Sequence, residues 1–191
     1  MKNRLTAIVE EAATVAYRSA HTTYVKQTQD FRVALATVAG EFFACPVQNG
    51  VTTGVGHSVR PTVDVIGLDT LVPGDVIITN DPFSSGGLCT HTMDIHLVRP
   101  IFRGRTLVCF AWSFIHASDI GGAVPGSISP AHTEVFQEGL RLRPLKLYKA
   151  GTLNEEIVAI LRDNSRIPDE IWGDLQAMLS AMALLDRRIN E

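Results

Sequence analysis

Hydrophobic residues recur at helical spacing near both ends of the chain. One stripe lies within residues 4–20 and a second follows Pro168, and both repeat at steps of three and four residues, as in a helix with one buried face. The first stripe is Leu5, Ile8, Val9, Ala12, Ala13 and Ala16, and the second is Leu175, Met178, Leu179, Met182 and Leu185. Thr152-Leu153-Asn154-Glu155 matches a capping box and predicts another helix through about Arg162. Helices are therefore expected at the N- and C-terminal ends.

Between these helices the apolar residues form short runs separated by turn residues, which is typical of strands. The predicted strands are Phe31–Val38, Glu41–Cys45, Val76–Thr79, Ile95–Phe102 and Thr106–Ile115, with a further extended segment at Pro144–Tyr148. Turns at Ala39-Gly40 and at Arg103-Gly104-Arg105 would join consecutive strands into hairpins. We therefore predict a mixed α+β fold with a hairpin-rich, largely antiparallel sheet, in a single domain spanning residues 1–191.

The composition is that of a globular domain with a substantial core, since 46% of the residues are hydrophobic and 19% are charged. The net charge is −3 without a run of like charge, which argues against a nucleic-acid partner, because phosphate binding needs a concentrated basic face. The apolar segments fall short of the roughly 20 residues that cross a bilayer. Glu10 and Glu11 interrupt what would be the apolar core of a signal peptide. We expect a cytoplasmic protein that does not bind membranes.

Nucleotide-binding and disulfide motifs are missing from the sequence. The glycines of Val47–Arg60 match neither a phosphate-binding loop nor a dinucleotide fingerprint, so any ATP site must lie elsewhere. The three cysteines are Cys45, Cys89 and Cys109, and their spacing fits neither a disulfide framework nor a CxxC zinc site. Cys89 and Cys109 are interpreted as buried thiols.

The densest group of potential metal ligands lies within residues 80–122. His91 and Asp94 form a short HxxD chelate just before one strand of the longest hairpin, and His116 follows the other strand, so a regular hairpin would bring Asp94 beside His116. Two imidazoles and a carboxylate are ligands for divalent Zn, Mn or Fe, which can activate bound water or polarise a carbonyl. Asp119 follows His116 by three residues and is the candidate catalytic residue, which would orient the His116 ring.

Spacing alone leaves other interpretations open. His91 can be a loop histidine bonded to backbone, Asp94 a residue that caps local amides, and His116 a core histidine. His96 lies inside an apolar strand and is interpreted as structural, and His57 as solvated or capping. Serine catalysis is a weak alternative, because the serines near these histidines do not lie in a G-x-S-x-G elbow.

Several blocks along the chain resemble one enzyme family. The blocks are GDVIITNDPFSSGGLCTHTMDIHLVRPIF, HASDIGG, QEGLRLRPLKLYKAG and NSRIPDEIWGDLQA. Their order resembles the hydantoinase B/oxoprolinase family, which includes B subunits of ATP-dependent N-methylhydantoinases, the matching half of 5-oxoprolinases, and the metal-bearing subunits of acetone and acetophenone carboxylases. The resemblance implies that His91, Asp94 and His116 are metal ligands, and that Asp30 of the QTQDF block adds a fourth.

The resemblance also implies an activity and partners. A hydantoinase A-type subunit would use ATP to phosphorylate the substrate, and this chain would hold the divalent metal at which a cyclic amide, such as a hydantoin or 5-oxoproline, is opened. Two alternatives remain: a subunit of an ATP-dependent ketone carboxylase of the acetone or acetophenone type, and a non-catalytic assembly subunit. Family members are longer, so the chain is expected to be an N-terminal portion that works with a C-terminal B-type fragment. The loop Val47–Val59 lacks the extended histidine-containing phrase common in hydantoinases and oxoprolinases.

Overall fold

The computed structural model describes residues 2–51 and 57–191 and shows a mixed α+β fold. The part that it describes contains a seven-stranded sheet of order β2-β1-β5-β4-β3-β6-β7, in which every neighbouring pair is antiparallel. The helices are α1 (Lys2–Ser19), α2 (Thr23–Lys26), α3 (Arg60–Ile66), α4 (Glu155–Asp163) and α5 (Pro168–Asn190), with short 3-10 helices η1 (Leu68–Thr70) and η2 (Val135–Gln137). The strands are β1 (Phe31–Ala36), β2 (Phe42–Ala44), β3 (Val76–Thr79), β4 (Asp94–Arg103), β5 (Thr106–His116), β6 (Leu145–Lys149) and β7 (Thr152–Leu153). The predicted fold class is confirmed.

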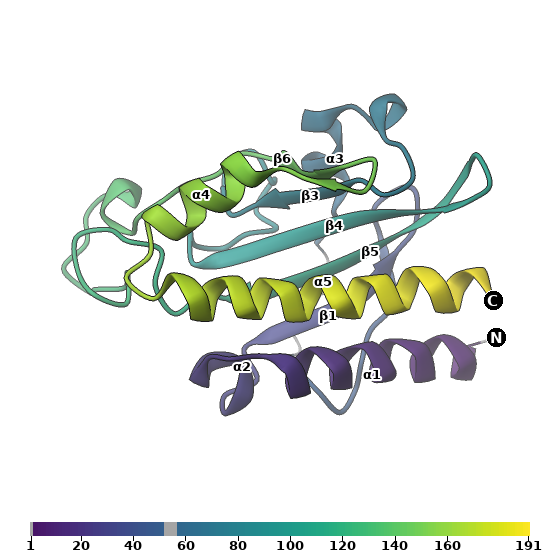
Figure 1. Cartoon of the computed structure of the whole chain (residues 1–191), viewed down its shortest axis with the longest axis horizontal. Helices are drawn as coiled ribbons and strands as arrows, with labels where there is room; N and C mark the ends of the chain where they lie inside the picture. The colour runs from purple at the N-terminus through teal and green to yellow at the C-terminus, as the bar shows by residue number, and fades with distance from the viewer. Residues whose placement is uncertain (1, 52–56) are drawn as a thin grey trace.

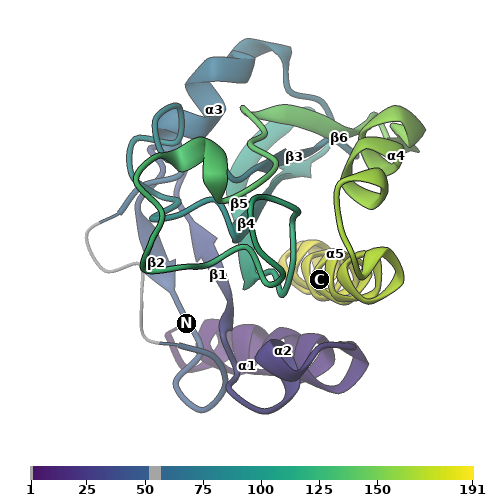
Figure 2. The same cartoon turned by 90° about the vertical axis from the view of Figure 1, so that its left-hand side faces the viewer.

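The sheet lies between a layer of helices and a layer of loops. Figure 1 shows α1 and α5 running side by side along the sheet, with α4 beside β6. The helix α5 packs against α1 and α4 and against the central strands β4 and β5. Figure 2 shows α3 and the long loops on the side of the sheet away from α5. Because side chains alternate along a strand, each central strand gives one set of residues to the helices and the other set to the loops.

The helix-covered face of the sheet, which packs under α1 and α5, is almost entirely aliphatic. Its buried strand residues include Phe31, Val33, Leu35, Ile95, Leu97, Ile101, Ala111 and Ile115. The predicted stripe of α5 is buried against them except for Leu179, which is partly buried, and the stripe of α1 is buried except for Leu5, which is partly buried. The two terminal helices therefore supply most of the hydrophobic cover of the sheet.

A buried carboxylate fixes α5 against the end of α1. Asp174 of α5 is fully buried, and its oxygens accept hydrogen bonds from the backbone N–H groups of His21 and Thr22 and from the hydroxyl of Thr22. Gly173 precedes it, and a Cβ at this position would lie 2.7 Å from the His21 ring. Glycine therefore allows the close approach that the Asp174 hydrogen bonds require.

The opposite face, called here the loop-covered face, is aromatic near its centre and polar at one end. Trp112 and Phe114 of β5 lie on it, and α3 buries Val63 against the same cluster. Farther along the two central strands, the positions on this face are occupied by His96 of β4 and then by Asp94 and His116. The candidate ligands therefore occupy the last positions of an otherwise apolar strand surface.

One β-bulge decides which side chains of the β4–β5 hairpin share a face. Gly104 has a φ of 62°, which supplies the left-handed conformation needed in a two-residue hairpin turn. Beyond the turn the register shifts by one residue, because Val108 has no partner on β4. Asp94 then lies opposite His116. With the register of the turn continued, Asp94 would oppose Ile115, and His116 would point to the other face.

The structure changes one predicted helix start. The capping-box prediction begins at Thr152, but α4 begins at Glu155, and the side chain of Asn154 accepts a hydrogen bond from the N–H of Glu156. The residues before Asn154 form β7 instead and pair with β6, which holds Thr152 in an extended conformation.

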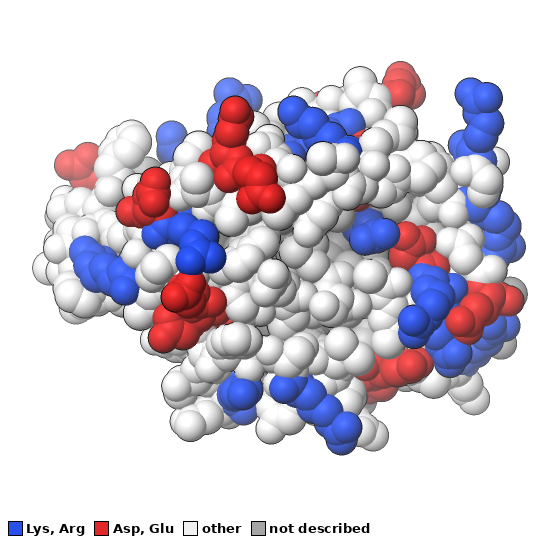
Figure 3. Space-filling view, in the orientation of Figure 1, with Lys and Arg blue, Asp and Glu red and all other residues white. Residues whose placement is uncertain are grey.

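Charged side chains of both signs are interspersed on the face shown in Figure 3, around an uncharged area over the middle of α5. The charges of α5 gather near its ends, with acidic residues in the first turn and basic residues in the last, as the helix dipole favours. No helix in the described ranges is both long and apolar enough to span a membrane.

Candidate metal centre

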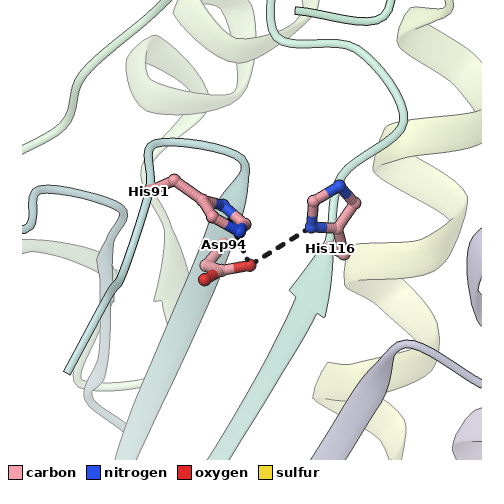
Figure 4. Close-up of side chains that lie close together, drawn as sticks. All are labelled: His91, Asp94 and His116. Carbon is pink, nitrogen blue, oxygen red and sulfur yellow. Dashed lines mark hydrogen bonds and ion pairs between the residues drawn. The ribbon is translucent and has the colours of Figure 1, made fainter. Parts of the chain in front are cut away.

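Three side chains converge at the open end of the β4–β5 hairpin, as Figure 4 shows. Asp94 begins β4, His116 ends β5, and His91 lies in the loop before β4. The Oδ1 atom of Asp94 is 3.4 Å from Nδ1 of His91 and 3.3 Å from Nδ1 of His116. One potential ligand atom from each residue lies within 4.8 Å of the others. The structure thus brings the three predicted ligands together, and metal binding by them stays a prediction.

The spacing and the donor atoms fit a divalent metal. Two ligands that each lie about 2.1 Å from a tetrahedral ion are roughly 3.4 Å apart, close to the separations measured from Asp94. Nδ1 of His91 is buried and makes no hydrogen bond within the described part of the chain, although it lies within ion-pair range of Asp94. A buried polar atom that lacks a hydrogen bond is unfavourable, and coordination would give Nδ1 of His91 a direct partner. The residues present are therefore suited to Zn, Mn or Fe.

Asp30, the expected fourth ligand, lies directly beside the three. Its backbone oxygen accepts a hydrogen bond from the N–H of His116 at 2.9 Å, and its Oδ2 is 3.8 Å from Nδ1 of that histidine. Burial raises the pKa of Asp30 and outweighs the charge of His116, which lowers it, and the nearby charge of Asp94 adds to the rise. A cation at the cluster would favour the ionised form of this carboxyl.

Asp94 is the negative centre of the cluster. Burial raises its pKa, but the hydrogen bond with His116, the charge of His91 and the hydroxyl of Thr90 outweigh burial and hold the pKa of Asp94 below its usual range. The Thr90 hydroxyl donates to Oδ2 at 2.8 Å, which leaves Oδ1 facing the two histidines. The ring of Tyr24 packs against His116 with 4.9 Å between ring centroids. Neither Thr90 nor Tyr24 was predicted from the sequence, and only the position of Thr90 next to the HxxD motif could have indicated it.

Hydrogen bonds from distant segments hold the loop that carries His91. The side-chain amide of Asn80 donates to the backbone oxygens of Thr92 and Leu140. The backbone N–H and the hydroxyl of Thr92 both donate to the carboxylate of Glu138, at 3.0 and 2.8 Å. His91 is therefore positioned by a braced loop rather than by a helix or strand.

Asp119 has different partners from those expected. Its carboxylate accepts hydrogen bonds from the backbone N–H groups of Gly121, Gly126 and Arg166 and from the Arg166 guanidinium. Burial raises its pKa, but these bonds outweigh burial and hold the pKa of Asp119 below its usual range. His116 is not among its partners, so the expectation that Asp119 orients His116 is not supported. Asp119 instead ties the loop after β5 to the connection between α4 and α5.

The candidate ligands line a cavity of about 260 Å³. The residues that line it are Asp30, His57, Leu88, Thr90, His91, Asp94, His96, Trp112, Phe114 and His116. Burial lowers the pKa of His96 to about 4, so its ring is neutral near pH 7, and its Nδ1 accepts a hydrogen bond from the Trp112 indole. His57, interpreted as solvated or capping, is exposed and also lines the cavity. The aromatic wall was missed because Trp112 and Phe114 have the pattern of ordinary core residues.

The cysteines do not extend this group of ligands. Cys89 and Cys109 are buried thiols, as predicted. Burial raises the pKa of Cys89 to about 12 and that of Cys109 to about 11. The thiolate that would bind a metal is therefore strongly disfavoured at both positions.

Known proteins share both the sequence and the fold of this chain. 5-Oxoprolinase 1 of Arabidopsis thaliana is 31% identical over 196 residues, which cover 94% of this chain and 15% of that protein. The crystal structure of the ATP-dependent caprolactamase from Pseudomonas jessenii matches with a TM-score of 0.81 at 26% identity, over 98% of this chain and 32% of the other. A nucleotide-free acetone carboxylase matches with a TM-score of 0.79 over 98% of this chain and 24% of the other, and its 19% identity shows a common fold alone.

The chain thus spans about a third or less of the length of these proteins. The family model named Hydantoinase B/oxoprolinase matches residues 1–191, from the first residue to the last. The chain belongs to the hydantoinase B/oxoprolinase family.

Proposed function

We propose that this chain is the metal-bearing part of an ATP-dependent enzyme complex that opens a cyclic amide. The observation that carries the proposal is the convergence of His91, Asp94 and His116 on the wall of a small cavity, with Nδ1 of His91 left without a hydrogen-bond partner in the described chain. The caprolactamase and the 5-oxoprolinase are named for cyclic amides, and this supports the substrate class. Hydantoins and 5-oxoproline are substrates of this kind.

Some residues of the site would hold the metal, and others would orient these ligands and shield them from solvent. His91, Asp94 and His116 would hold the ion, and the carboxylate of Asp30 would be a fourth ligand. When bound, a divalent ion supplies Lewis acidity and lowers the pKa of coordinated water. Thr90 fixes the orientation of Asp94. Only 7% of Asp94 and 6% of His116 is exposed, so electrostatic interactions of these two ligands are strengthened, whereas the His91 and Asp30 side chains remain partly open to solvent.

A separate subunit would supply the ATP chemistry. The sequence lacks a phosphate-binding loop, and the related caprolactamase and acetone carboxylase are described as ATP-dependent. A hydantoinase A-type subunit that phosphorylates the substrate fits this division. Because the chain spans about a third or less of its relatives, a C-terminal B-type segment would complete the enzyme. Such a complex would work in the cytoplasm.

Metal binding is the first test of this function. The full chain, titrated with Zn²⁺ or Mn²⁺, is expected to bind one equivalent. His116→Ala should weaken binding by more than the 10–100-fold that is typical of losing a residue behind a ligand. His21→Ala removes an exposed histidine away from the cavity and should leave binding unchanged. A wild-type chain that binds no divalent ion would contradict the proposal, as would His116→Ala with unchanged affinity.

Isotope labelling then separates the proposed reaction from its two alternatives. With the partner subunit, ATP and ¹⁸O-labelled water, label is expected in the carboxyl group of the opened amide. Entry of labelled bicarbonate into the product would instead indicate ketone carboxylation. Full ATP-dependent turnover by a complex with alanine at His91, Asp94 and His116 would show a non-catalytic assembly role.

A further inference from the structure

His96 carries a buried hydrogen-bond donor that the described residues leave unpaired. Its side chain lies on β4 two residues after Asp94, on the same face of the sheet, and is 2% exposed. Its Nδ1 accepts a hydrogen bond from Nε1 of Trp112 at 3.0 Å. An indole nitrogen can only donate, so Nδ1 of His96 bears a lone pair and the proton of the neutral ring is on Nε2. That Nε2 is buried without a partner in the described ranges.

Two aromatic neighbours hold the His96 ring in place. The ring stacks on Phe114 with 5.2 Å between centroids and an interplanar angle of 18°, and Trp112 packs against it at 5.5 Å. The strand register places His96 directly opposite Phe114, so the hairpin itself builds this stack. A ring held by a stack and by a hydrogen bond cannot turn freely toward another acceptor. The unpaired N–H is thus fixed in direction, and a buried donor of this kind calls for a partner.

The cavity beside the candidate ligands can supply that partner. His96, Trp112 and Phe114 line it together with Leu88, and the lining residues in the described chain include no lysine or arginine. This wall offers a neutral N–H and flat apolar surface, which suits an uncharged acceptor oxygen on a ring better than a free carboxylate or phosphate. The volume of about 260 Å³ lies below the roughly 300–1,000 Å³ of pockets for drug-sized ligands, so the ring must be small.

We propose that Nε2–H of His96 donates a hydrogen bond to a carbonyl oxygen of a small cyclic amide that the partner subunit has not phosphorylated, with the ring against Trp112 and Phe114, beside His91, Asp94 and His116. The inference rests on the proposed function and adds a determinant of substrate specificity to it. His96 is a binding residue that selects an uncharged carbonyl acceptor. It neither holds the metal nor transfers a proton.

The test uses the full chain loaded with Zn²⁺ and the cyclic amide 2-pyrrolidinone as a probe. NMR of ¹⁵N-histidine-labelled protein should show His96 as the Nε2–H tautomer, with an Nε2 resonance that shifts when the probe is added. His96→Phe keeps an aromatic ring on Phe114 and removes the donor, and should weaken probe binding about tenfold, the effect of one hydrogen bond. His96→Gln restores an N–H near the same position and should recover most of the affinity. Zn²⁺ affinity should remain at the wild-type value in both variants.

The assignment of His96 would be overturned if the wild type and His96→Phe bound 2-pyrrolidinone with equal affinity. It would also be overturned if the probe did not shift the Nε2 resonance. Neither result would contradict the proposed metal site. If His96→Phe does not fold, the wild type is compared with 2-pyrrolidinone and its thioamide, whose sulfur is the weaker acceptor, and equal affinities for the two would overturn the assignment. A wild type that binds neither probe would also overturn it. The oxygen-isotope experiment judges the proposed function separately.

Discussion

The two faces of the central sheet come from the same strands and differ in what covers them. The helix-covered face packs residues such as Ile95 and Ile115 under α1 and α5, whereas the loop-covered face carries Asp94, His96 and His116 at alternating positions of the same strands. On the first face, α1 and α5 pack over these residues in one aliphatic core. A cavity of about 260 Å³ lies over the second face. Neighbouring residues in the sequence thus point alternately to the helix-packed core and to the cavity.

This separation has a physical basis in the strand period of two residues. A substitution that points toward the helices changes packing and leaves the cavity wall unchanged, because the sheet lies between them. A substitution that points toward the loops changes donors and acceptors around the cavity. Variants on the helix-covered face should therefore lower the free energy of unfolding, whereas variants on the loop-covered face should lower the affinity for metal or ligand.

The largest expected effect on stability comes from the helix-covered side. Leu175 of α5 is fully buried in the aliphatic core, and Leu175→Ala should lower the free energy of unfolding by about 2–5 kcal/mol, because it removes apolar contacts and leaves a cavity. Urea unfolding of the metal-free chain measures the loss, and Zn²⁺ binding by the folded variant should match that of the wild type. Leu179→Ala, at a partly buried position of the same helix, should cost less. If a folded Leu175→Ala chain lost Zn²⁺ binding, this would contradict the inference that packing on the helix-covered face leaves the metal site unchanged.

A smaller effect on stability is expected from Asp119, which follows the candidate ligand His116 by three residues and holds the loop after β5 by hydrogen bonds. Asp119→Asn weakens bonds to the N–H groups of the loop and to Arg166, and should cost about 1.5–3 kcal/mol, the value of a hydrogen bond to a charged group. Its pKa is lower in the folded chain than in the unfolded one, so the stability it contributes is complete above about pH 4 and is lost as the pH falls through the folded pKa. The difference between wild type and variant should therefore narrow below pH 4.

Urea unfolding between pH 3 and pH 7 measures the difference in free energy of unfolding between the wild type and Asp119→Asn. Asp163→Asn, at an exposed position, is the control and should hardly change the free energy of unfolding. Zn²⁺ affinity at pH 7 should be the same for Asp119→Asn and the wild type. A tenfold loss of Zn²⁺ affinity with unchanged stability would instead restore Asp119 to the role of orienting His116.

Much of the helix-covered side could be predicted from the sequence, because long periodic stripes such as that of α5 are strong local signals. The loop-covered side was predictable only in part. The neighbouring positions of Asp94 and His116 follow from the hairpin, and the structure confirms them. The unpaired Val108, which turns both side chains to one face, leaves no mark in the apolar pattern, since a bulge depends on strand pairing.

Long-range contacts account for the other differences at the site. Arg166, the partner of Asp119, lies 47 residues farther along the chain, and no local spacing rule links the two. His96 was interpreted as structural, and the structure buries it in β4. Its Nε2, unpaired in the described chain, becomes visible only once Trp112 is found on its Nδ1. The predicted loop Val47–Arg60 lies partly outside the described residues, so the expectation for its central part stays a prediction.

The smallest expected effect comes from Thr90, on the loop-covered side. Thr90→Val removes the hydroxyl that donates to Oδ2 of Asp94 and keeps the side-chain shape, so Zn²⁺ affinity should fall about tenfold, as for other residues that orient a ligand. Thr90 is exposed, so water can replace its hydroxyl at Oδ2 of Asp94, and the metal-free chain should lose only about 0.5–1.5 kcal/mol of stability. Thr90→Ser keeps the hydroxyl and should bind Zn²⁺ like the wild type. Thr90→Val could instead destabilise the metal-free chain as strongly as Leu175→Ala and leave Zn²⁺ affinity unchanged. The loop that carries Thr90 would then stabilise the fold rather than the metal site, which would contradict the contrast between the two faces.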